Sequence, residues 1–127
     1  MTEKHNCIVV PVMLRPDPTS PNTACFGVIV KCDETGYCDF KIAQGDEDAI
    51  SRIVAFFPKF GRANFEQAMA WAKHDIEYSI SQEKTRPGFF ANLIRPRENI
   101  IRYDSARTSK SADPADELNR QYELLVH

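Results

Sequence analysis

The sequence lacks a long apolar run. Among its 127 residues the longest mainly apolar stretch is Cys7–Leu14, which is far too short to span a bilayer. The first six residues, Met-Thr-Glu-Lys-His-Asn, also lack the basic start, apolar stretch and small-residue cleavage site of a signal peptide. We therefore expect a cytoplasmic protein that does not bind a membrane.

Closely spaced cysteine pairs are lacking as well. The four cysteines form no Cys-x-x-Cys motif, which is the common spacing of zinc ligands. In a reducing cytosol we expect free thiols, and those in apolar segments should behave as small hydrophobic residues. The exception concerns Cys32 and Cys38, which flank the turn-like stretch Asp33–Gly36 and could approach each other across a hairpin.

The recurrent catalytic motifs are absent too. There is no Gly-rich phosphate loop and no Gly-x-Ser-x-Gly elbow. The three histidines are His5, His74 and His127, which are far apart in the sequence. His5 and Cys7 could supply two metal ligands, but no further pair accompanies them. The sequence therefore predicts no cofactor, no metal ion and no catalytic residue set, and it leaves open whether the protein is an enzyme.

What is present is the composition of an ordinary globular domain. Hydrophobic residues make up 43% and charged residues 27%. The length is that of one domain with one core, so we expect a single domain over residues 1–127.

Three segments near the start predict β-strands. Residues 7–14 are apolar and β-branched, which indicates a strand buried on both faces, and Pro11 within it indicates an edge position or a bulge. Residues 24–32 and 37–42 predict an antiparallel hairpin. Gly27 in the first of these indicates a bulge or a close approach of another backbone.

Helical periodicity follows. Asp46 predicts the N-cap of a helix that ends near Phe57, and Asn64 with Gln67 has the capping-box spacing for a second helix to about Ser81. The pair Asp113-Pro114 predicts the start of a last helix, whose apolar positions share one face.

Together these segments predict an α+β fold. We expect one mainly antiparallel sheet of about four strands, with the helical hairpin on one face and the C-terminal helix packed onto the domain. Residues 99–104 predict the fourth strand, and residues 89–94 fit either a strand or a helical turn. Residues 108–112 are polar and predict a mobile loop.

The net charge of −2 conceals a basic segment, residues 84–110. It contains seven lysines and arginines but only two acidic residues, a local charge of +5 that leaves −7 on the rest of the chain. Five of the seven cations are arginine, which suits paired hydrogen bonds to carboxylate or phosphate. The alternative is that these cations pair with the acidic remainder of the chain, at roughly 0–1 kcal/mol for each surface pair.

The candidate partner- or anion-binding residues lie in two proline-flanked blocks and the strand after the second: Arg15, Asp17, Arg95, Arg97, Glu98 and Arg102. Proline restricts both blocks, so we expect rigid loops that meet in one electropositive patch. Two functions fit such a patch. One is a non-enzymatic interaction module that binds an acidic protein partner or nucleic acid. The alternative is a metal-dependent phosphodiester or nucleotide-processing enzyme in which Asp17 and Glu98 hold the metal.

The two blocks also carry a family resemblance. Arg15-Pro16-Asp17-Pro18 and the later block Phe90–Arg102 resemble the signature of the bacterial family called domain of unknown function 3037 (DUF3037). The chain departs from that pattern at Thr23–Gly27, where the family has an acidic residue and Asn-x-Gly. The resemblance implies a small bacterial cytoplasmic protein, sometimes encoded beside a HipA-like kinase of a toxin–antitoxin system. That kinase is thus one expected partner, whereas no activity or catalytic residue follows from the family.

Overall fold

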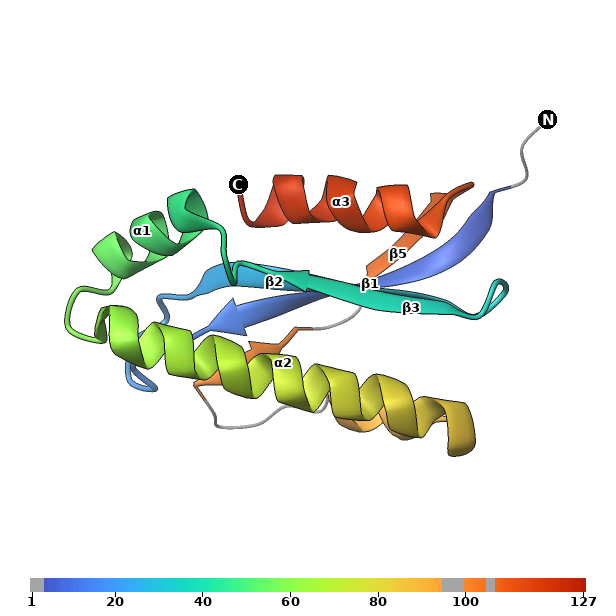
Figure 1. Cartoon of the computed structure of the whole chain (residues 1–127), viewed down its shortest axis with the longest axis horizontal. Helices are drawn as coiled ribbons and strands as arrows, with labels where there is room; N and C mark the ends of the chain where they lie inside the picture. The colour runs from blue at the N-terminus through green and yellow to red at the C-terminus, as the bar shows by residue number, and fades with distance from the viewer. Residues whose placement is uncertain (1–3, 95–99, 105–106) are drawn as a thin grey trace.

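A computed structural model describes residues 4–94, 100–104 and 107–127. The elements follow in the order β1 (His5–Leu14), β2 (Ala24–Cys32), β3 (Tyr37–Ile42), α1 (Glu47–Phe56), α2 (Gly61–Thr85), the short 3-10 helix η1 (Phe89–Asn92), β4 (Ile101–Tyr103), β5 (Arg107–Ser111) and α3 (Pro114–Leu125). The expected α+β class is confirmed (Figure 1).

The sheet has five strands, and every pairing in it is antiparallel. Its order is β3-β2-β1-β4, and β5 pairs with β1 on the same side as β4. The predicted hairpin of residues 24–32 and 37–42 is confirmed as β2 and β3. Two edges follow from this order, with β3 at one and β4 with β5 end to end at the other.

Pro11 lies in β1, which has neighbours on both sides, so the expected edge position was wrong; a register shift with β2 lies close by, between Val12 and Met13. The Pro11 carbonyl accepts a bond from the Asp104 N–H at 3.0 Å, which shows that the backbone groups of Pro11 face the β4 and β5 side. The N–H that proline lacks would therefore face that side, beyond the end of β4 and before the start of β5.

Helices cover both faces of the sheet. In Figure 1, α2 runs along one face and α3 along the other, with α1 beside the C-terminal end of α3. Phe26 of β2 packs edge-to-face on Phe65 of α2, with ring centroids 5.6 Å apart, and Tyr122 of α3 is fully buried. This coverage explains why β1 and β2 are apolar on both sides.

Some boundaries differ from those expected. The cap at Asp46 is confirmed, since its side chain accepts the Ala49 N–H, but α2 begins at Gly61 rather than after Asn64. The Asn64 amide instead donates back to the Phe60 carbonyl at 2.6 Å. Residues 107–111 form β5, so the expectation of a mobile loop at 108–112 was wrong.

The cysteines are free thiols. Cys32 pairs with Tyr37 and Cys38 with Lys31, so the two cysteines occupy neighbouring rungs of the hairpin and point to opposite faces. The approach considered for Cys32 and Cys38 is thus not made. Cys32 instead contacts Cys7, and burial together with that contact raises the pKa of Cys7 to about 11.

Candidate functional site

The first predicted block is a loop folded onto itself. The guanidinium of Arg15 donates to the carbonyls of Ser20, at 3.0 Å, and Pro18, at 2.9 Å. The Asp17 carboxylate accepts the hydroxyl of Thr19 at 2.7 Å and its N–H at 2.9 Å, and these bonds hold the pKa of Asp17 below its usual value. Both charged side chains therefore serve in part to fix the loop.

The loop lies beside the segment that enters β4. The Arg15 N–H donates to the Ile100 carbonyl at 2.7 Å. Arg95, Arg97 and Glu98 lie outside the described residues, so their approach to this loop, and a metal site shared by Asp17 and Glu98, stay predictions. Arg102 is described: it is half-buried in β4, opposite Met13 of β1.

The described cations of the basic segment have no ion-pair partner among the described residues. Among the residues that the structure describes, none of these five makes an ion pair: Lys84, Arg86, Arg102, Arg107 and Lys110. The acidic residues pair elsewhere, as Glu47 and Glu66 do with Arg62. Internal pairing was the alternative to a binding role, and the part of the chain that is described supplies no such pair for these five cations.

Three of these cations line one edge of the sheet. We call Arg102, Arg107 and Lys110 the basic edge, because they lie on β4 and β5. Arg102 and Arg107 pair with Met13 and Val9, which share one face of β1, so the two arginines share a face as well. Lys110 pairs with Asn6 and points to the opposite face.

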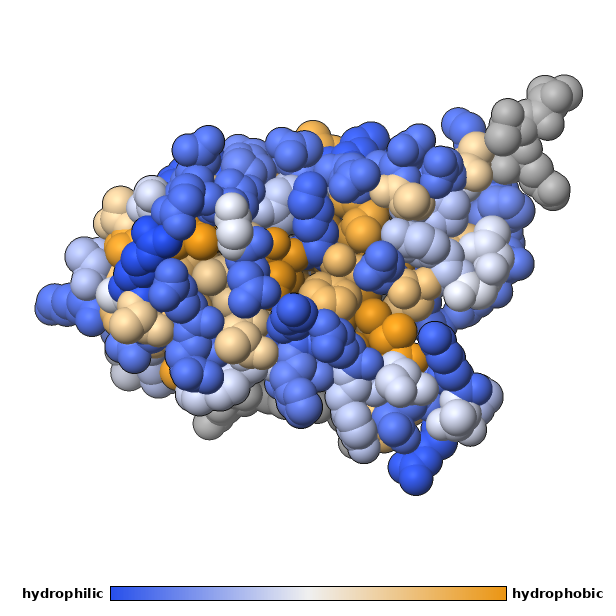
Figure 2. All heavy atoms as spheres, viewed as in Figure 1, coloured by the Kyte–Doolittle hydropathy of each residue, from blue (hydrophilic) through white to orange (hydrophobic). Residues whose placement is uncertain are grey.

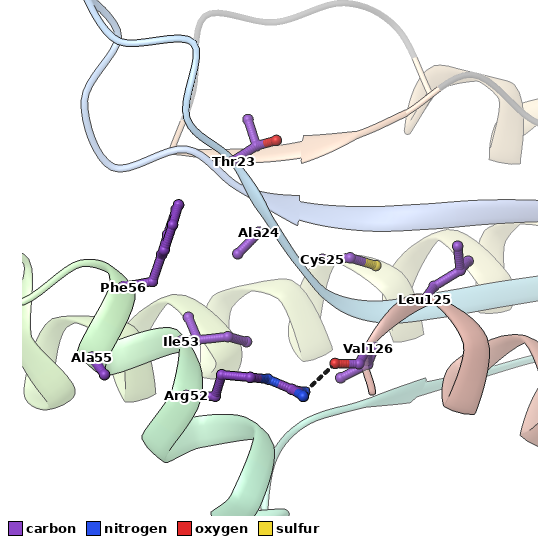
Figure 3. Close-up of a pocket in the computed structure, with 9 residues that line it drawn as sticks. All are labelled: Thr23, Ala24, Cys25, Arg52, Ile53, Ala55, Phe56, Leu125 and Val126. Carbon is purple, nitrogen blue, oxygen red and sulfur yellow. Dashed lines mark hydrogen bonds between the residues drawn. The ribbon is translucent and has the colours of Figure 1, made fainter.

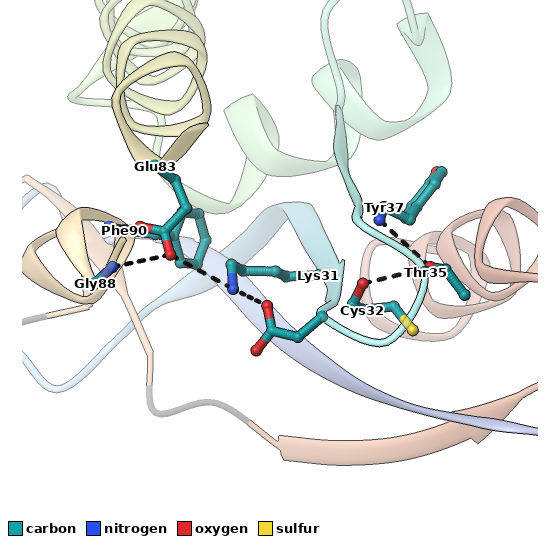
Figure 4. Close-up of polar contacts among 8 residues, drawn as sticks. Lys31, Cys32, Thr35, Tyr37, Glu83, Gly88 and Phe90 are labelled. Atoms are coloured by element: carbon teal, nitrogen blue, oxygen red, sulfur yellow. Dashed lines mark hydrogen bonds and ion pairs between the residues drawn. The ribbon is translucent and has the colours of Figure 1, made fainter. Parts of the chain in front are cut away.

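A carboxylate anchors the start of the basic segment. The Glu83 carboxylate accepts the N–H groups of Phe90, at 2.8 Å, and Gly88, at 3.1 Å, and lies 3.7 Å from the Lys31 ammonium (Figure 4). The Phe90 bond is the main cause of a pKa for Glu83 below its usual value. Glu83 therefore holds η1 against the end of α2 and is not free for acid–base chemistry.

A second polar cluster joins α1 to α3. The Asp46 carboxylate accepts the Tyr122 hydroxyl at 2.6 Å and lies 2.5 Å from Nε2 of His127. These bonds lower the pKa of Asp46 to about 2, while burial raises the pKa of Tyr122. A phenol that holds its proton this firmly is a poor base or nucleophile, so the cluster fastens the two helices rather than supplying catalysis.

An open apolar pocket of about 490 Å³ lies between α1, the start of β2 and the end of α3 (Figure 3). The Arg52 guanidinium at its side donates to the Val126 carbonyl. Phe56 at its rim is 58% exposed. Sequence reasoning missed this pocket; a signal for it was Phe56, an aromatic residue that stays exposed although it lies at helical spacing from the buried Ile53.

The described residues offer little for metal chemistry or membrane insertion. No group of three or more His, Cys, Asp or Glu side chains within residues 4–94, 100–104 and 107–127 is placed to hold a metal ion. Over the same residues, no helix combines the length and apolar character that crossing a membrane requires.

Comparison with known proteins gives one family. A family model described as "Protein of unknown function (DUF3037)" matches residues 12–126, nearly the whole chain. No curated protein and no solved structure shows a significant match.

Proposed function

The chain belongs to the DUF3037 family of unknown function, and for this member we propose a non-enzymatic interaction module whose basic surface binds an acidic protein partner. The surface consists of the basic edge with the adjoining loop of Arg15. One observation carries the proposal: the described cations of residues 84–110 make no ion pair among the described residues, although the chain as a whole is acidic.

The chemistry of the edge favours a protein over nucleic acid. Asp104 is exposed and lies between Arg102 and Arg107 in the sequence. Its N–H donates to the Pro11 carbonyl of β1, so Asp104 lies along the same edge of the sheet as the two arginines. A carboxylate there repels a continuous phosphate backbone but can face a lysine or a backbone N–H of a mixed protein surface. A HipA-like kinase, suggested by the family resemblance, is the partner to test first.

The test compares two defined probes, a peptide of Glu-Glu-Lys repeats and a single-stranded oligonucleotide, across a salt titration. We expect the peptide to bind more tightly at equal salt, because its lysines can face Asp104. In the double variant Arg102→Gln, Arg107→Gln, its affinity should fall about tenfold and its salt dependence should become shallower, because screened charge contacts are lost.

A matched control removes the same charge elsewhere. The variant Lys59→Gln, Lys73→Gln alters two exposed lysines at the start and middle of the α2 region, away from the basic edge. It should bind the probe almost as the unmodified protein does. Equal losses in both double variants, at unchanged melting temperatures, would show that binding follows net charge and would refute the basic edge as the site; tighter binding of the oligonucleotide would refute the acidic protein partner.

A further inference from the structure

The edge strand β3 at the other side of the sheet is open. In the view of Figures 1 and 2, β3 runs between α3 and α2, and Figure 2 shows apolar surface exposed between these two helices. Among the described strands, β3 pairs only with β2. An open strand of this kind can pair with a strand of another chain.

The backbone groups that face outward can be identified. The Ala43 N–H donates to the Phe26 carbonyl at 2.8 Å, so it points toward β2. Because backbone groups alternate along a strand, those of Lys41 and Asp39 also point toward β2. The outward N–H and C=O groups are then those of Cys38, Phe40 and Ile42. The Phe40 N–H confirms this direction, since it bonds to the Asp39 carboxylate at 2.8 Å rather than to β2.

The charged side chains of β3 are complementary to those of a second, antiparallel copy of β3. Asp39 and Lys41 flank Phe40 and point to the face that α3 covers, where the Lys41 ammonium lies 4.5 Å from the Tyr122 ring centroid. If two β3 strands run antiparallel about a two-fold axis at Phe40, each Asp39 lies opposite the Lys41 of the other copy. Axes at Asp39 or Lys41 would instead place like charges opposite each other, which is unfavourable.

We propose that two copies of this protein pair through β3, antiparallel and centred on Phe40, to form one continuous sheet across a dimer. Phe40 pairs with Phe40 and Cys38 with Ile42 as hydrogen-bonded pairs, each exchanging two N–H···O=C bonds. Asp39 and Lys41 form the closer, non-hydrogen-bonded pairs, in which opposite charges attract. The interface is isologous, as a closed two-fold dimer requires.

The contacts of the single chain are compatible with this exchange. In the single chain the Asp39 carboxylate accepts the Phe40 N–H. In the dimer the Phe40 carbonyl of the second copy accepts that N–H instead. The Asp39 carboxylate can then pair with Lys41 of the second copy. Charged edge residues usually prevent pairing with unrelated strands. Here the same charges also select the register and the partner, because few foreign strands carry the complementary order.

The test is a charge exchange followed by sedimentation or light scattering over a concentration series. The unmodified chain should be a dimer with a dissociation constant in the micromolar range, as suits a small interface. Asp39→Lys and Lys41→Asp should each weaken the dimer about tenfold or more, because attraction becomes repulsion at both charged pairs. Mixed in equal amounts, the two variants should form a heterodimer, and the double variant should again form a homodimer.

The control variants change charge outside β3. Asp75→Lys and Lys59→Asp make the same charge changes on exposed residues outside β3 and should leave the dimer intact. Amide exchange of Cys38 and Ile42 should slow as the protein concentration rises. A monomer at all concentrations, a dimer that both β3 variants leave intact, or two variants that do not associate on mixing would each overturn the proposal.

Discussion

At the scale of single residues, Gly27 lies beside the bulge in β2 and has no side chain where β3 approaches closely. The register shifts between Val12 and Met13, whose partners are Gly27 and Cys25, so Phe26 is the extra residue. A Cβ atom on Gly27 would lie 2.6 Å from Cγ2 of Ile42 and 3.0 Å from the Lys41 carbonyl oxygen. Both readings of this glycine from the sequence, a bulge and a close backbone approach, are confirmed.

The first prediction follows from that contact. Gly27→Ala should lower the free energy of unfolding by about 1–3 kcal/mol, because the added methyl overlaps Ile42 and the backbone of β3. Chemical denaturation measures the loss. In an Ile42→Ala background, which removes Cγ2, the same substitution should cost less. Equal costs in the two backgrounds would show that Ile42 is not the obstacle.

At the scale of elements, α3 depends on a few apolar anchors. Leu118 is 7% exposed against the sheet, whereas Leu124 on the same helix is 64% exposed. Leu118→Asp should destabilise the fold by a few kcal/mol, since it buries a carboxylate without a partner. Leu124→Asp is the matched control and should shift the melting temperature little. If the two variants melt alike, α3 is not docked through Leu118.

Elements with strong local signals were predictable from the sequence, and those fixed by distant contacts were not. Asp46 and Asp113 supply capping oxygens locally, so the starts of α1 and α3 were found. The start of α2 has no side-chain cap. The spacing of Asn64 and Gln67 resembles a capping box, but Asn64 lies within the helix and its side chain donates to the Phe60 carbonyl. Residues 107–111 are polar and become a strand only because β1 offers them an unpaired edge, which no local pattern reveals.

The candidate site was predictable only in part. Charge counting located the basic segment, but it could not separate free cations from paired ones. Pairing depends on which carboxylates lie nearby in space. Glu47, for example, forms an ion pair with Arg62. Glu83 lies near the Lys31 ammonium and accepts backbone N–H groups at the start of η1. The self-complementary order of Asp39 and Lys41 is visible in the sequence, but it acquires meaning only once β3 is known to be an edge.

At the scale of the whole molecule, the two sheet edges are assigned different roles by the two proposals. In the proposals the β3 edge, which carries Asp39 and Lys41, joins copies, whereas the cations of β4 and β5, which make no ion pair with any described residue, face an acidic partner. Because these edges are opposite, a dimer through β3 leaves both basic edges exposed. Such a dimer would engage an acidic partner with two sites more tightly than one site alone would allow.

Asp46 links segments from across the chain, so the stability of the whole fold should respond to its ionisation. Its carboxylate caps α1 and accepts the hydroxyl of Tyr122, and His127 lies against it. The hydroxyl bond is the first cause of a pKa lowered from 3.8 to about 2. A group whose pKa is lower in the folded state stabilises the fold above its unfolded pKa and loses that effect as pH falls through the folded value.

The last prediction is therefore a pH-dependent one. Asp46→Asn should cost about 1–2 kcal/mol near neutral pH, since it removes a charged acceptor that is about a quarter exposed. The difference from the unmodified protein should shrink as pH falls from about 4 to about 2, where the carboxylate takes up its proton in the folded state as well. Urea unfolding across this window measures it. Asp48→Asn, an exposed change in the same helical turn, is the control and should show no comparable convergence. A constant difference between Asp46→Asn and the unmodified protein at every pH would mean that Asp46 acts through packing alone, and that its charge does not hold α1 to α3.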